Sequence, residues 1–287
     1  MLVAGAILYT AFVWWFATGL VMCLARRPED WHGTLLLTLA MPTALAALAI
    51  VAVAQETSVA GALLGFTSAV MLWGWFETSF LFGHLTGPRR APCPPGVGNW
   101  RRFRLAFAVL RDHELALFGV LGLLVLGLWD APNRVALDTF TALWACRLAS
   151  KLCLFVGVPT VTQDMLPQRM RYLTSYFGRG RPGLVYGLAV GALAFAAWTL
   201  LRGALVGETA FAAVGGALVG GLVALAVLEH ALMALPVRDS RLWDWAVRVH
   251  GKGAQDAGTQ TRSGVRGREL KGVALRHRAV VPAERDA

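Results

Sequence analysis

Long apolar runs recur through most of this chain, and they restrict its fold more than any other feature. Several approach the roughly 20 residues that an α-helix needs to cross about 30 Å of hydrocarbon. The 287 residues are 56% hydrophobic and only 15% charged, whereas soluble domains carry about 25% charged residues. The runs are continuously apolar and do not alternate with period two, which argues against a membrane β-barrel. We therefore predict an all-α, polytopic integral membrane helical bundle.

The apolar runs divide the chain into seven predicted transmembrane helices. They cover residues 2–25, 34–54, 59–82, 105–129, 135–158, 183–205 and 209–235. The start of the fourth helix is ambiguous, because residues 100–110 could instead lie along the membrane surface. The first run is followed, not preceded, by Arg26 and Arg27. A cleavable signal peptide has its basic residues before the apolar core, so we expect a retained helix.

The distribution of basic residues predicts the orientation. Arginines gather after the first, third and fifth helices and in the tail, whereas the intervening loops carry few. Because basic loops remain in the cytoplasm, we expect the N-terminus outside and the C-terminus in the cytoplasm. The basic residues responsible for the net charge of +10 therefore serve to set the orientation of the helices. Since no recognition motif accompanies it, we expect no nucleic-acid partner.

The predicted organisation has three parts: a membrane domain at 1–236, an interfacial helix at 237–250 and a tail at 251–287. Leu242, Trp245 and Val249 recur at helical spacing, which is typical of an amphipathic helix at the membrane interface. The tail is rich in Gly, Arg and Lys with few aromatic residues. That composition predicts a disordered basic segment on the cytoplasmic side.

Two glycine pairs, Gly187/Gly191 and Gly216/Gly220, have small-xxx-small spacing in the last two predicted helices. This spacing permits close approach of helix backbones. The pairs could pack the last two helices on each other or on a partner chain. We favour the first arrangement.

Ionisable residues inside the predicted helices form the candidate site. Each costs about 3 kcal/mol or more near the middle of a bilayer, so it needs a partner or a function. The candidates are Glu77, His84, Asp112, His113, Glu114, Arg147, Lys151, Glu229 and His230. In the predicted topology all of them lie in the inner half of the bilayer. Because unpaired charges would be costly there, we expect one mutually paired cluster.

Helical spacing groups some of these candidates further. Glu77 and His84, seven residues apart, are expected on one helical face. Arg147 and Lys151, four residues apart, are expected on another.

Three roles for the cluster remain open. It could be an ion-pair network that fixes helix packing, or a path for protons or substrate. It could also bind a metal or a tetrapyrrole, because His and carboxylate ligands suit iron, zinc or a pigment magnesium. The candidate metal ligands are Glu77, His84, His113, Glu114, Glu229 and His230. No HxxxH, ExxH or HExxH spacing supports the metal reading.

Five stretches carry a resemblance to a known family. They are WGWFETSFLFGHLTGPRRAPCPP at 73–95, RDHELAL at 111–117, RLASKLCLFVGVP at 147–159, PQRMRYLTSYF at 167–177 and LEHALMALPVRDSRLWDWA at 228–246. The chain resembles the PuhE-type photosynthetic complex assembly protein 2 family of purple phototrophic bacteria. Many members read HHELAL and KLNLFLGVPN, where this chain has Asp112, Cys153 and Thr160. These departures weaken a ligand role for the three positions.

The resemblance implies a multi-pass protein of the bacterial inner membrane, cytoplasmic or intracytoplasmic. It implies a factor for assembly of the photosynthetic reaction centre and core light-harvesting complex, with their subunits or other assembly factors as partners. Bacteriochlorophyll or a precursor would be the ligand handled. A non-enzymatic role is favoured over an enzymatic one. The alternative is a metal-dependent membrane enzyme, or enzyme subunit, of tetrapyrrole or carotenoid biosynthesis. The family supplies no residue-level roles.

Overall fold

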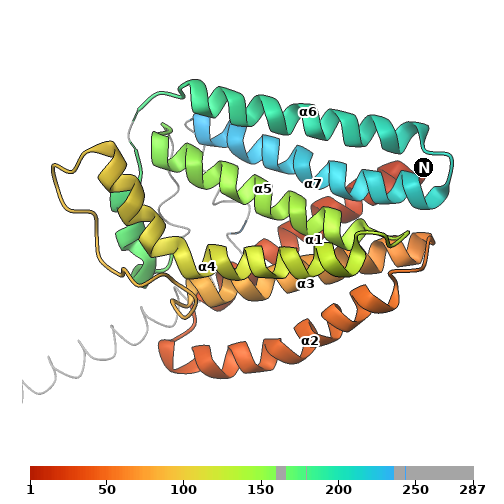
Figure 1. The fold of residues 1–287 in the computed structure, drawn as a ribbon, viewed down its shortest axis with the longest axis horizontal. Coiled ribbons are helices and arrows are strands. Elements are labelled where there is room, and N and C mark those ends of the chain that lie inside the picture. Colours follow the sequence, from red (N-terminus) through yellow and green to blue (C-terminus); the bar gives the residue numbers. More distant parts are fainter. Residues whose placement is uncertain (160–165, 179, 236–242, 244–287) are drawn as a thin grey trace, which may run out of the picture. The chain divides into compact units, whose positions relative to one another are not determined.

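The computed structural model describes residues 1–159, 166–178, 180–235 and 243, and the bundle forms one unit within Met1–Leu242. Its long helices are α1 (Leu2–Ala25), α2 (His32–Ala52), α3 (Val59–Leu81), α4 (Asn99–Leu128), α5 (Val135–Val156), α6 (Leu184–Val206) and α7 (Ala210–Ala234), as Figure 1 shows. Two short 3-10 helices are added, η1 (Glu29–Trp31) and η3 (Gln168–Tyr176). The prediction of an all-α polytopic bundle is confirmed. The predicted interfacial helix and tail lie outside the described residues, apart from Trp243.

Six of these helices, all except α4, are long and apolar enough to cross a membrane. α4 is also long, with 30 residues, or about 45 Å at the helical rise. Its central turns carry Arg111, Asp112 and Glu114, which interrupt the apolar composition. Residues 100–110, whose placement the sequence left open, belong to this same helix. In Figure 1 these first turns run obliquely to the rest of α4.

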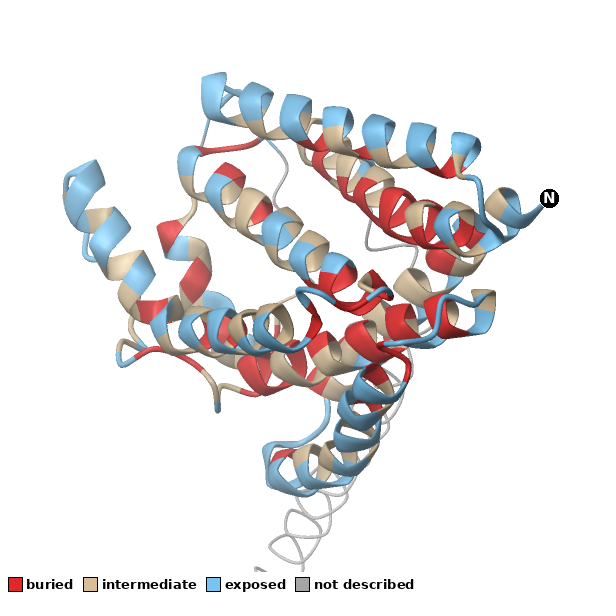
Figure 2. Ribbon diagram, turned by 45° about the vertical axis from the view of Figure 1, so that its right-hand side comes forward, coloured by how far each residue is buried: buried red, intermediate tan, exposed pale blue. Residues whose placement is uncertain are grey.

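α7 lies at the centre of the bundle and packs against α1, α3, α5 and α6. Its core residues Ala217 and Leu218 are fully buried, and they share one apolar cluster with Phe66 of α3. α2 and α6 lie at the periphery, and Figure 2 shows exposed residues along their outer faces. Those faces carry apolar residues such as Leu48 and Leu188, as expected of surfaces that contact lipid.

The α6–α7 contact depends on small residues of α7. A Cβ atom at Gly216 would lie 3.2 Å from the Cβ of Ala204, and one at Gly220 would lie 3.0 Å from the side chain of Leu201. The prediction that the last two helices pack on each other is confirmed for this pair. Gly187 and Gly191 of α6 take no part, since a Cβ at either would meet nothing within 4 Å.

The connections alternate between the two ends of the bundle. At one end, Asn133 after α4 donates from its backbone N–H to Ala54 O and from its side chain to Val53 O after α2, at 3.1 and 3.0 Å. At the other end, the connections after α1, α3 and α5 meet, since Arg169 of η3 forms an ion pair with Glu29 of η1 and donates to Phe82 O after α3. The arginine-rich connections therefore share one end of the molecule.

The connection from α3 to α4 lies directly on the α4 backbone. α3 ends at Leu81, and Gly83 follows in the left-handed region with φ +74°, a conformation that glycine adopts without strain. Gly87 then donates its N–H to Val109 O at 2.7 Å. A Cβ atom at Gly87 would lie only 2.0 Å from Ala108 O. The close approach therefore requires glycine at this position.

We expect Gly87→Ala to destabilise the bundle by about 1–3 kcal/mol, the usual cost of forcing an extra methyl group into a packed site. The reason is that the loop must move away from α4 and lose the Gly87–Val109 hydrogen bond. Thermal unfolding of the purified protein in detergent micelles measures the change. Gly119→Ala in α4 is the control, because its Cβ would meet nothing within 4 Å. Equal unfolding temperatures for the two variants would contradict this reading.

Candidate functional site

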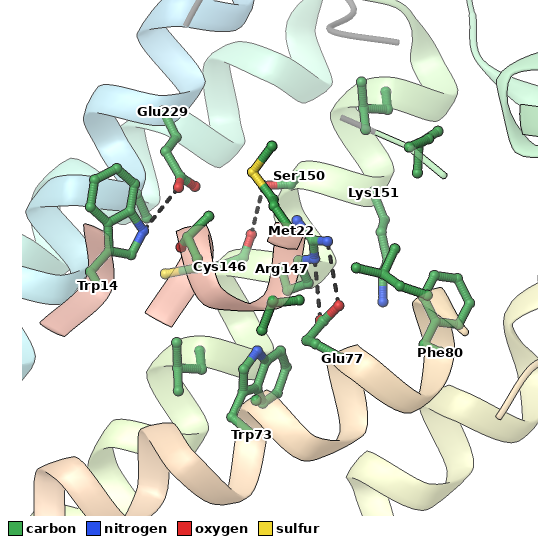
Figure 3. A pocket seen from close by; sticks show the side chains of 18 of the residues that line it. Trp14, Met22, Trp73, Glu77, Phe80, Cys146, Arg147, Ser150, Lys151 and Glu229 are labelled. Carbon is green, nitrogen blue, oxygen red and sulfur yellow. Dashed lines mark hydrogen bonds and ion pairs between the residues drawn. The ribbon is translucent and has the colours of Figure 1, made fainter. Parts of the chain in front are cut away.

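A cavity of about 420 Å³ lies within the bundle, between α1, α3, α4, α5, α7 and the η3 segment. Its volume falls in the range of small-molecule sites, about 300–1,000 Å³. Most of the wall is apolar or aromatic, and Figure 3 shows Trp14, Trp73 and Phe80 among its residues. The polar side chains on the wall are Thr18, Glu77, Arg147, Ser150, Lys151, Tyr176 and Glu229.

Glu77 of α3 and Arg147 of α5 form an ion pair at the cavity wall (Figure 3). Arg147 Nε lies 3.3 Å from one carboxylate oxygen of Glu77, and Nη2 donates to the other at 3.5 Å. The Glu77 side chain is only 10% exposed, whereas that of Arg147 is 48% exposed. Since Arg147 lines the cavity, its free surface is available to whatever occupies this space.

Lys151 and Glu114 form a second ion pair, one helical turn further along α5. Their side chains are 18% and 17% exposed, so the pair is largely removed from solvent. Lys151 lines the cavity and also lies 6.0 Å from the centre of the Phe80 ring. α5 thus presents two cations, each matched by a carboxylate from a different neighbouring helix.

Glu229 of α7 lines the same cavity and accepts a hydrogen bond from Trp14 Nε1 of α1 at 3.0 Å. The bond, drawn in Figure 3, links the neighbouring helices α1 and α7. Glu77, Arg147, Lys151 and Glu229 are therefore brought to one cavity from three helices.

The two predicted histidines that are fully buried, His113 and His230, have different surroundings. His113 Nε2 lies 3.9 Å from a Glu77 oxygen, which is beyond hydrogen-bond distance. Neither of its ring nitrogens has a hydrogen-bond partner among the described residues. His230 Nδ1 donates to Ala226 O at 2.7 Å, and its Nε2 lies 3.5 Å from Ser150 Oγ. His113 therefore adjoins the Glu77 pair, whereas His230 is bound within α7 and to α5.

Two of the predicted site residues lie apart from this group. His84 is exposed and follows the end of α3 at Leu81. The expectation that it shares a helical face with Glu77 is wrong, because Gly83 has already ended the helix. Asp112 pairs with its neighbour Arg111 at 2.8 Å, and their side chains are 40% and 47% exposed.

The candidate metal ligands are dispersed by the same geometry. Within the part of the chain that the structure describes, no group of three or more His, Cys, Asp or Glu side chains is arranged to hold a metal ion. Glu77 and His113 adjoin each other, Glu114 is bound to Lys151, and His84 lies outside the bundle.

Arg169 of η3 is a structural residue that the sequence reasoning did not single out. Its Nη1 lies 2.6 Å from His32 Nδ1 and donates to Phe82 O at 3.3 Å. His32 is buried, stacks on the Phe82 ring and has its Nε2 2.9 Å from Arg27 O. These contacts fit an Nε2–H tautomer whose Nδ1 accepts from Arg169. The arginine thereby joins the starts of η3 and α2 to the end of α3.

A second set of contacts holds η3 against the loop after α3. Arg89 Nε donates to Tyr176 Oη at 2.7 Å, and Tyr176 donates in turn to Ala91 O at 2.8 Å. Cys93 N–H donates to Ser175 Oγ at 2.8 Å. Because Tyr176 also lines the cavity, these bonds fix its wall at the arginine-rich end. The quoted stretches 73–95 and 167–177 contain these residues, but sequence spacing could not show that the two stretches meet.

The geometry defines a polytopic helical membrane protein with a mainly apolar cavity that contains paired charges. Residues 1–254 match the family described as "Protein of unknown function (DUF3623)", and the chain belongs to that family. A relative from Rhodobacter capsulatus, described as "Uncharacterized 30.4 kDa protein in puhA 5′region", is 36% identical over 243 residues. The alignment covers 83% of this chain and 88% of the relative. No solved structure matches the chain.

The Glu114–Lys151 pair gives a direct test of the charge pairing. We expect Lys151→Met to lower the free energy of unfolding by about 3 kcal/mol, because it leaves a buried carboxylate without its cation. The double variant Glu114→Gln/Lys151→Met removes both charges and should recover most of the loss. Denaturant unfolding in micelles, analysed as a double-mutant cycle, measures the coupling. Additive effects of the two substitutions would show that the pair is not energetically coupled.

Proposed function

We propose that this protein is a membrane assembly factor for the bacterial photosynthetic reaction centre and core light-harvesting complex. The observation that carries the proposal is the relative from the puhA 5′ region, to which the chain is similar over most of both lengths. That region is a photosynthesis gene region. Membership of the same family extends the similarity across residues 1–254.

The position of the cavity supports a role in handling a ligand. Glu77, Arg147, Tyr176 and Glu229 line it, and each lies in one of the stretches that carry the family resemblance. We propose that bacteriochlorophyll or a precursor is held there, or that its supply to the complex is regulated from there. The mainly apolar wall suits a hydrophobic pigment.

The arginine-rich end supports an orientation. We propose that it faces the cytoplasm, with the N-terminus of α1 outside, because basic connections remain on the cytoplasmic side. The cavity, whose wall includes η3, then lies toward the cytoplasmic face of the inner membrane. Nascent complex subunits or other assembly factors would meet the protein there.

A deletion strain grown phototrophically tests the assembly role. We expect a severalfold lower content of reaction centre and core antenna in its membranes, restored by a plasmid copy of the wild-type gene. Near-infrared absorption of isolated membranes measures the complexes, and solvent extraction measures total bacteriochlorophyll. Unchanged complex levels in the deletion strain would reject the proposal.

Metal analysis of the purified wild-type protein distinguishes an assembly factor from the alternative, a metal-dependent enzyme of tetrapyrrole or carotenoid biosynthesis. Near-stoichiometric iron or zinc, together with loss of pigment synthesis in the deletion strain, would favour the metal-dependent enzyme. Metal-free protein with normal pigment synthesis and reduced complexes would favour assembly.

A further inference from the structure

Arg147 carries more hydrogen-bond donors than its protein partners use. A guanidinium has N–H groups on all three of its nitrogens, and here Nε and Nη2 face Glu77. Nη1 has no hydrogen-bond partner among the described residues, although nearly half of the side chain is exposed. Arg147 lines the cavity, so this nitrogen is open to a molecule held there. The occupant of the cavity is therefore expected to supply oxygen acceptors to this nitrogen.

The charges around the cavity indicate the type of acceptor. Glu77 already neutralises Arg147, and Glu114 neutralises Lys151. Among the described wall residues, both cations are thus matched by carboxylates, so an anionic head group would meet no unmatched cation there and would be repelled by the carboxylates. A neutral oxygen, such as a keto, ester or quinone carbonyl, can accept from Nη1 without adding charge.

The apolar part of the cavity wall indicates the chemistry of the rest of the ligand. Trp73 and Phe80 of α3 and Leu222 of α7 are among the residues that surround the space. Such a surface favours an apolar body that is removed from water. The donor and the apolar wall together describe an amphipathic molecule with a small neutral polar end.

We propose that the cavity binds a neutral, carbonyl-bearing hydrophobic molecule whose carbonyl oxygen accepts hydrogen bonds from Arg147. This proposal specifies the ligand of the proposed function. It rests on that function to the extent that ligand handling is part of it. Prenylated quinones and chlorin pigments with keto and ester groups share the chemistry. The recognition is by hydrogen bonding to a carbonyl and not by charge.

The test uses the full chain, purified in detergent from a host that makes no bacteriochlorophyll. The probes are ubiquinone-10, bacteriochlorophyll a and the anionic lipid oleate, and binding is measured by equilibrium titration. We expect at least one of the neutral probes to bind near 1:1 and more tightly than oleate. The neutral probe that binds more tightly identifies the source of the ligand chemistry. Tighter binding of oleate, or no saturable binding of either neutral probe, would overturn the inference.

Variants of the ion pair test the role of Arg147. The double variant Glu77→Gln/Arg147→Met removes both charges and should weaken binding of the neutral probe about tenfold or more, as expected for loss of a hydrogen bond from a charged donor. Arg111→Gln/Asp112→Asn is the matched control, because it removes an exposed ion pair outside the cavity wall. Equal loss in both double variants, or in neither, would overturn the inference. If the first double variant does not fold, Arg147→Lys keeps the charge but leaves one donor nitrogen in place of three, and should weaken binding likewise.

A single substitution tests the charge argument. Glu77→Gln leaves Arg147 uncompensated, so oleate should bind more tightly relative to the neutral probe than it does in the wild type. An unchanged ratio would contradict the argument. Failure of binding alongside lowered complexes in the deletion strain would reject this inference and leave the assembly role intact. Intact binding alongside normal complexes would reject the assembly role alone.

Discussion

The pairing of charges inside an apolar bundle is the constraint on which this structure depends. A lone carboxylate or guanidinium between membrane helices is costly, so Glu77 on α3 requires Arg147 on α5, and Lys151 requires Glu114 on α4. Both cations lie on α5, one turn apart. The pairs therefore fix the rotation of α5 about its axis and its level relative to α3 and α4. Apolar packing alone would leave both much less defined, because the outer surface of each helix is compatible with lipid.

The arginine-rich end of the bundle is held in a different way, by polar contacts between its connections instead of apolar packing. Arg169 bonds to His32 and to the backbone of Phe82, while Arg89 bonds to Tyr176. Loops near a membrane surface have few apolar partners, so backbone carbonyls and aromatic hydroxyls supply the contacts. Because Tyr176 lines the cavity, these connections also determine the shape of the site. The arginines that set the predicted topology thus have a second, local role in the fold.

The sequence predicted the helices well because length and composition alone decide them. It could not predict which side chains pair within the bundle. Depth in the membrane gives the level of a residue but not which neighbouring helix it faces. Glu77 and Arg147 were placed at one level, and only the structure shows that they face each other. His84 was misplaced because helical spacing was counted from Glu77 beyond the predicted end of the helix at residue 82, although glycine, here Gly83, often ends a helix. The Gly187/Gly191 spacing equals that of Gly216/Gly220, yet only the second pair faces a neighbouring helix.

The cavity explains why the ion pairs are placed in the wall and not in the packed centre around α7. A fully buried pair satisfies its charges internally and offers nothing to a ligand, whereas Arg147 is bound to Glu77 on one side and open on the other. Glu77 holds the guanidinium in position and cancels its charge at the same time. An arginine held in this way can donate hydrogen bonds with fixed geometry without attracting anions indiscriminately. Such an arrangement favours selection among neutral hydrophobic molecules, which differ from lipid chains mainly in the oxygens they carry.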